Sequence, residues 1–131
     1  MGAALGAKLA APDKMVVSLI GDGGFIYGCP VATLWSASVY NAPFLSIICN
    51  NRSYVAIREL VRREYGESSV SGEMGFEVGT DIKNPPEYAF IAKACNAYGQ
   101  TVEDPSELLS VLKNAVDQVR RGKAAVIDVR L

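Results

Sequence analysis

Short apolar runs alternate with segments of helical periodicity along most of the chain. Residues 15–20 are typical of a strand buried on both faces, and residues 44–49 of a second buried strand. Further strands are expected at 100–102 and 124–129. Helices are expected between these strands, at 3–11, 30–40, 54–63, 86–97 and 104–121. This alternation predicts a single three-layer α/β domain, with a mostly parallel sheet and helices on both faces.

Local signals fix some of the helix ends and faces. Asp104 is the expected N-cap of the helix at 104–121, with Pro105 in its first position and Gly122 as its stop. The helix at 30–40 is expected to place four residues on one face: Val31, Leu34, Trp35 and Ser38.

Residues 65–86 differ from the rest of the chain because they are rich in Gly, Ser, Glu and Pro. A loop of this length inside a compact domain is usually functional or mobile. We therefore expect one domain spanning residues 1–131, with a mobile loop near 65–84.

Composition narrows the function classes. The chain has 13 basic and 14 acidic residues and a formal net charge of −1, so the basic patch of a nucleic-acid-binding protein is not expected. No apolar stretch is long enough for a membrane span, and we expect a cytoplasmic protein. Histidine is absent, and the three cysteines are expected to be buried free thiols because no metal or disulfide spacing is present.

Two chemically unusual segments follow the first two predicted strands. Gly21-Asp22-Gly23-Gly24 follows the first, and Asn50-Asn51-Arg52-Ser53 follows the second. Ligands bind at the carboxyl ends of parallel strands, where glycine amides can surround an anion. A phosphate beside Asp22 requires a cation between them, and Mg²⁺ prefers such oxygen ligands. The two segments together favour a magnesium–diphosphate site, although each alone is also common in plain turns.

The same residues resemble the cofactor motif of the thiamine-diphosphate enzymes. In that family GDG is followed by NN, and here Gly21-Asp22-Gly23 and Asn50-Asn51 are separated by residues 24–49, which are 26 positions. Residues 34–37 (LWSA) and 40–43 (YNAP) resemble further segments of the acetolactate synthase and benzoylformate decarboxylase group. The resemblance implies the thiamine-diphosphate-binding fold and, as cofactors, thiamine diphosphate and Mg²⁺.

The resemblance also implies roles for individual residues. The side chains of Asp22 and Asn51 and the backbone carbonyl of Ser53 would bind Mg²⁺. Gly21 belongs to the motif, and Asn50 would be structural. Gly24 replaces a serine often found in the family, which removes one hydroxyl contact to phosphate. The diphosphate would be held by the backbone amides of four residues: Gly23, Gly24, Tyr54 and Val55.

No catalytic residue is expected in this chain, because family members activate the cofactor with a glutamate from a second, pyrimidine-binding domain. That domain would belong to the same or another chain of a homo-oligomer acting on a small 2-keto acid, by decarboxylation or ligation. The chain alone is expected to be inactive, as an excised piece of a longer protein. A subunit of a split 2-keto acid oxidoreductase and a non-catalytic α/β assembly module are the alternatives.

Overall fold

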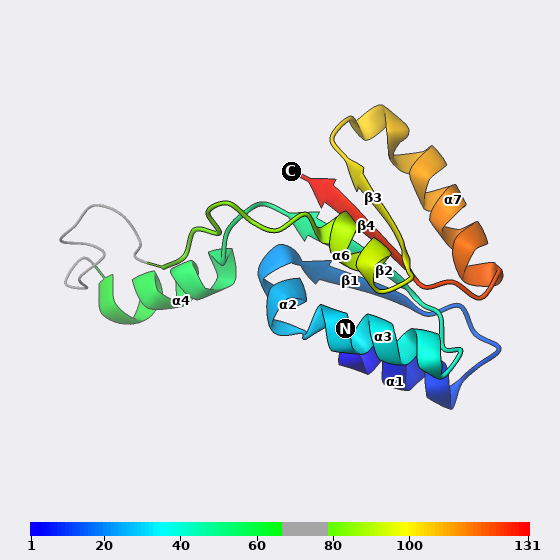
Figure 1. Ribbon diagram of the computed structural model, residues 1–131. Coiled ribbons are helices and arrows are strands. Elements are labelled where there is room, and N and C mark those ends of the chain that lie inside the picture. Colours follow the sequence, from blue (N-terminus) through cyan, green and yellow to red (C-terminus); the bar gives the residue numbers. More distant parts are fainter. Residues whose placement is uncertain (67–78) are drawn as a thin grey trace. The chain divides into compact units, whose positions relative to one another are not determined.

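A computed structural model describes residues 1–66 and 79–131 (Figure 1). The chain divides into two compact units, the first formed by Met1–Asn51 with Pro86–Leu131 and the second by Arg52–Pro85. Residues 67–78, which make up most of the loop predicted at 65–84, lie outside the described residues, so the mobility of that loop stays a prediction.

The first unit is built around a four-stranded sheet in which all neighbouring strands are parallel. The strand order is β1-β2-β4-β3. The strands are β1 (Val17–Gly21), β2 (Leu45–Asn50), β3 (Tyr98–Val102) and β4 (Ala125–Arg130). Helices cover both faces of this sheet, which confirms the predicted fold class.

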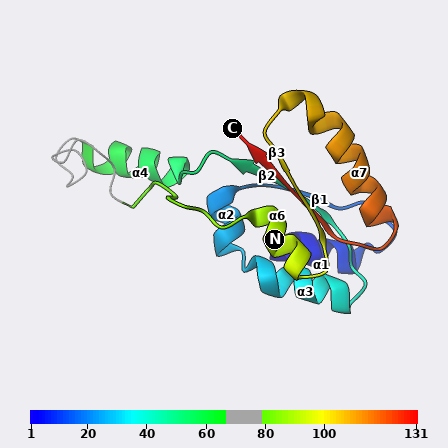
Figure 2. The ribbon, with the colours of Figure 1, turned by 45° about the horizontal axis from the view of Figure 1, so that its top comes forward.

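The helices form two layers (Figure 2). One face carries α1 (Gly2–Ala10), α2 (Asp22–Tyr27), α3 (Pro30–Val39) and α6 (Tyr88–Ala94). The other carries α7 (Leu108–Arg120), which follows the short 3₁₀ turn η2 (Pro105–Glu107). The Asp104 side chain accepts a 2.8 Å hydrogen bond from the Ser106 amide, so Asp104 is a cap as predicted, but it caps η2, and the N-cap of α7 is Glu107. Each layer buries its own apolar cluster, one around Phe25, Phe44 and Tyr88 and the other around Val111, Val119 and Ile127.

The prediction that the first strand is buried on both faces is wrong. Strand β1 is an edge strand, and Val17 and Leu19 are 51% and 72% exposed. Helix α7 packs against β2, β3 and β4, and it leaves this face of β1 uncovered. A continuous apolar run therefore does not distinguish a central strand from an edge strand.

Helix α3 forms where it was predicted, but its buried face is different. It buries Thr33, Leu34 and Ala37, whereas Trp35 is 63% exposed. The exposed side of the helix carries an apolar stripe, which consists of Val31, Trp35 and Val39. The three cysteines are free, as expected, but none is fully buried: Cys29 is exposed, and Cys49 and Cys95 are half-buried.

The second unit contains α4 (Val55–Tyr65) and a segment that runs back beside the start of this helix. An antiparallel bridge joins Ser53 to Asp81. The Arg58 guanidinium donates hydrogen bonds to the Ser53 hydroxyl at 2.7 Å and to Asp81 at 2.8 Å. These bonds fix the start of α4 against residues 80–81.

Candidate functional site

The first predicted segment lies where β1 ends and α2 begins. The segment is not a plain turn, because the helix begins at Asp22, directly after the strand. Gly21 is the N-cap, with the extended backbone angles φ −74° and ψ 158°. The amides of the first helical turn have no partner within the helix, so they are suited to bind an anion. The Gly23 amide donates a 3.0 Å hydrogen bond to Asp22 Oδ1.

The Asp22 carboxylate is buried, with 1% of the residue exposed. Oδ1 accepts the hydrogen bond from Gly23, but Oδ2 has no hydrogen-bond partner among the described residues and no contact with solvent. A buried carboxylate oxygen without a partner is unfavourable, and a bound cation would offset that cost. Cation binding therefore requires a small opening or rotation of the side chain. The donor chemistry fits a hard cation such as Mg²⁺.

The glycines of this segment differ in what the fold demands of them. A Cβ added at Gly21 would meet no heavy atom within 4 Å, and the φ of Gly21 is open to any residue. The fold itself therefore gives no reason for glycine at position 21, whereas close approach by a ligand does. At Gly24 a Cβ would lie 3.0 Å from Ile20 Cγ1. A serine at position 24 would thus require the Ile20 side chain to shift by a few tenths of an ångström.

The second predicted segment follows β2, and its two asparagines have different environments. Asn50 is 3% exposed, and its Nδ2 donates a 2.9 Å hydrogen bond to Asp128 Oδ1. Asn51 is exposed. The burial of Asn50 agrees with the structural role expected for it, and Asn51 is the member of the pair that a ligand can reach.

The sheet brings these two segments to the same edge. Strands β1 and β2 are parallel neighbours, and Gly21 is in register with Cys49. Asp22 and Asn50 are each one residue beyond this pair, so the motif residues leave the sheet side by side at the carboxyl ends of adjacent strands. This is the position at which open parallel sheets bind ligands.

The other three predicted site residues, Ser53, Tyr54 and Val55, belong to the second unit. The Ser53 hydroxyl donates to the Thr80 carbonyl at 3.1 Å. The Tyr54 amide, a predicted diphosphate donor, already donates to the same carbonyl at 2.8 Å. Val55 is the first residue of α4, where helix amides have no intrahelical partner.

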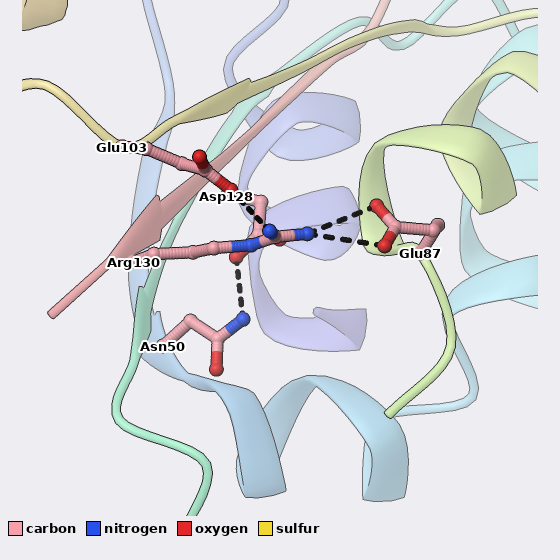
Figure 3. Close-up of polar contacts among 5 residues, drawn as sticks. All are labelled: Asn50, Glu87, Glu103, Asp128 and Arg130. Carbon is pink, nitrogen blue, oxygen red and sulfur yellow. Dashed lines mark hydrogen bonds and ion pairs between the residues drawn. The ribbon is translucent and has the colours of Figure 1, made fainter. Parts of the chain in front are cut away.

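Sequence reasoning missed a polar cluster at the ends of β3 and β4 (Figure 3). Arg130 Nη2 donates to both carboxylate oxygens of Glu87 at 3.1 Å, and Nη1 donates to Glu103. Arg130 Nε lies 3.9 Å from Oδ2 of the buried Asp128. The sequence signal that could have indicated this cluster is Asp128, the one carboxylate in the otherwise apolar predicted strand 124–129.

Burial raises the pKa of the Asp128 carboxyl group. The hydrogen bond from Asn50 and the positive charge of Arg130 act in the opposite direction, and the negative charges of Glu87 and Asp22 add to the increase. The influence of Asp22 shows that the two buried carboxylates, on β4 and just after β1, share one electrostatic environment.

Two other kinds of site have no counterpart in the part of the chain that the structure describes. No three His, Cys, Asp or Glu side chains gather there into a metal-binding cluster. The predicted magnesium site does not depend on such a cluster, because Asp22 is the one side chain of these four types among its predicted ligands. Every helix in residues 1–66 and 79–131 is too short or too polar to cross a bilayer.

Comparison with known proteins decides the family. Residues 1–129 match the family described as "Thiamine pyrophosphate enzyme, C-terminal TPP binding domain". The chain belongs to this family. The resemblance drawn from the GDG and NN motifs is thereby confirmed, and the chain is a thiamine pyrophosphate-binding domain of this type.

Similar proteins are enzymes considerably longer than this domain. The probable acetolactate synthase large subunit of Methanococcus aeolicus is 29% identical over 114 residues, which are 87% of this chain and 17% of that protein. Benzoylformate decarboxylase of Pseudomonas aeruginosa is 46% identical over 56 residues, which are 43% of this chain and 10% of that protein. A solved thiamine diphosphate-dependent 4-hydroxybenzoylformate decarboxylase of Rhodococcus jostii RHA1 superposes with a TM-score of 0.80 at 31% identity. That match covers 99% of this chain and 22% of the decarboxylase.

Proposed function

We propose that this domain binds Mg²⁺ and the diphosphate of thiamine diphosphate, as part of an enzyme that decarboxylates or ligates 2-keto acids. The observation that carries the proposal is the buried, unpartnered Oδ2 of Asp22 at the carboxyl end of β1. The Gly21 backbone beside it is open to close approach. An acceptor of this kind, at the N-terminus of a helix, suits a cation that bridges to a phosphate.

The predicted site residues would bind different parts of the magnesium–diphosphate group. Asp22 and Asn51 would bind the cation through their side chains, and Ser53 through its backbone carbonyl. The amides of Gly23 and Gly24 would donate to the diphosphate, with those of Tyr54 and Val55. The Gly23 and Tyr54 amides would first have to exchange their present hydrogen bonds, to Asp22 Oδ1 and the Thr80 carbonyl, for bonds to phosphate. When bound, the thiazolium ring of the cofactor supplies an electron sink for decarboxylation.

A second, pyrimidine-binding domain would complete the site, from the same chain or from another copy in a homo-oligomer. Two observations support this part of the proposal. Matched relatives are several times longer than this domain, and the stripe of Val31, Trp35 and Val39 on α3 is apolar and exposed. Exposed apolar faces of this kind mark contact surfaces. Alone, the domain would bind cofactor without turning over a 2-keto acid.

Calorimetric titration of thiamine diphosphate, with Mg²⁺ and with EDTA, tests the proposal. Wild type should bind only with Mg²⁺, and Asp22→Ala should lose this binding. Asp13→Ala is the matched control, because Asp13 is an exposed aspartate that precedes β1, at the opposite end of this strand from Asp22. The proposal fails if neither this domain nor the longer protein that contains it shows magnesium-dependent binding, or if Asp22→Ala binds like wild type.

A further inference from the structure

Asp128 lies at the same edge of the sheet as the two motif segments, but it belongs to neither of them. Asp128 lies on β4, in register with Ile48 of β2, and Asn50 is two residues beyond Ile48. Side chains two residues apart on a strand share a face, so Asn50 and Asp128 project from the same face of the sheet. Figure 3 shows the Asn50 amide directed at the Asp128 carboxylate, and the distance is 2.9 Å.

The end of β4 holds Asn50 at two points. Asp128 accepts from its side chain, and the Leu131 amide donates a 2.9 Å hydrogen bond to its backbone carbonyl. Both side chains of the Asn50–Asp128 pair are almost fully buried, at 3% and 1% exposure. A hydrogen bond in such a buried environment is stronger than one at the surface, because water cannot compete for the donor or the acceptor.

Asp128 also contacts a positively charged side chain, that of Arg130. Arg130 Nε lies 3.9 Å from Asp128 Oδ2, and the guanidinium is held by Glu87 and Glu103. The Arg130 side chain is 28% exposed, so solvent and salt screen its positive charge less than that of a fully exposed arginine. Ion pairs therefore connect Glu87, which precedes α6, and Glu103, which follows β3, through Arg130 to Asp128, and the hydrogen bond from Asn50 joins Asp128 to the last residue of β2.

We propose that Asp128 is a positioning residue for the cation site: it fixes Asn50, and through Asn50 the backbone from which Asn51 projects. This inference rests on the proposed function. Asn50 is the last residue of β2 and Asn51 is the first beyond it, so any rotation at Asn50 moves Asn51 directly. Partners in the second shell of a metal site orient the ligands, and their loss typically weakens metal affinity by about 10–100-fold.

Two variants separate positioning from stability. Asn50→Leu removes the donor without changing net charge, and it leaves the Asp128 carboxylate without this bond. The double variant Asn50→Asp with Asp128→Asn rebuilds a donor–acceptor pair with the roles exchanged and keeps the net charge of wild type. Circular dichroism and thermal unfolding establish that both variants are folded before binding is measured.

Magnesium-dependent binding of thiamine diphosphate should be at least about tenfold weaker in Asn50→Leu, and the exchanged pair should recover most of it. A second readout needs no ligand. ¹⁵N relaxation of the Asn51 amide should report a rigid backbone in wild type and in the exchanged pair, and a mobile one in Asn50→Leu.

Each outcome is decisive. Unchanged binding and unchanged Asn51 order in a folded Asn50→Leu variant would overturn the role of Asp128. So would an exchanged pair as impaired as Asn50→Leu, because Asn50 would then act without Asp128. If neither this domain nor the longer protein binds cofactor, but Asn51 loses its order in Asn50→Leu as described, the proposed function fails while the positioning of Asn51 stands.

Discussion

Replacing Asp22 with asparagine should stabilise this domain when no metal is present. In the metal-free fold Oδ2 is buried without a partner, and Asp22 is 1% exposed. Asparagine is nearly the same size and keeps a carbonyl oxygen, which can still accept the 3.0 Å hydrogen bond from the Gly23 amide. The substitution therefore removes a buried negative charge and preserves the contact that the charge makes.

The size of the effect follows from what is exchanged. An unsatisfied buried polar group costs about 1–3 kcal/mol, and more when it is charged. The amide nitrogen that replaces Oδ2 is also without a partner, so only part of this cost is recovered. We expect a gain of about 1–2 kcal/mol in the free energy of unfolding, which is about 3–8 °C in melting temperature for a domain of this size.

Urea unfolding followed by circular dichroism, first in EDTA and then with Mg²⁺ and thiamine diphosphate, measures both the stability gained without metal and the ligand stabilisation lost in the variant. In EDTA the variant should be the more stable protein. With ligand at about 100 times its dissociation constant, wild type should gain about 2.7 kcal/mol and the variant nothing. Asp13→Asn, at an exposed position, should stay within about 0.5 kcal/mol of wild type throughout. An Asp22→Asn variant less stable than wild type in EDTA would refute the reasoning.

Three further predictions concern other parts of the domain. Gly99→Ala should destabilise by about 1–3 kcal/mol or more in urea unfolding, because the new Cβ would lie 2.0 Å from the Ala89 carbonyl oxygen; an unchanged midpoint would mean that α6 moves freely. Burial raises the pKa of Asp128 above 3.8, so stability should be full below that pH and fall as pH rises through the raised pKa. Asp128→Asn should flatten this decline when the free energy of unfolding is measured across pH. An equally steep pH profile in the variant would mean that Asp128 does not cause the decline. Trp35→Ser, which removes the centre of the α3 stripe, should reduce self-association in sedimentation velocity; wild type that stays monomeric at high concentration would contradict the contact role of α3.

Much of the candidate site was predictable because its signals are local. Glycine at a strand end, a carboxylate between glycines and a pair of asparagines after the next strand depend only on residues close together in sequence. Parallel pairing then places their ends at one edge of the sheet, since strands joined by a crossover helix run in the same direction. The register of Gly21 with Cys49 shows this arrangement directly.

The sequence by itself determined the α/β class, the order of the main elements and the motif that identifies the family. Only the tertiary structure decided that β1 is an edge strand, that α3 presents Trp35 outward, and that Asn50 is buried against Asp128. The physical reason is the range of the interactions. Helix and strand periodicity are set by neighbours a few residues away, whereas exposure and charge pairing depend on which distant segments pack together, and Asn50 meets a partner 78 positions further along the chain.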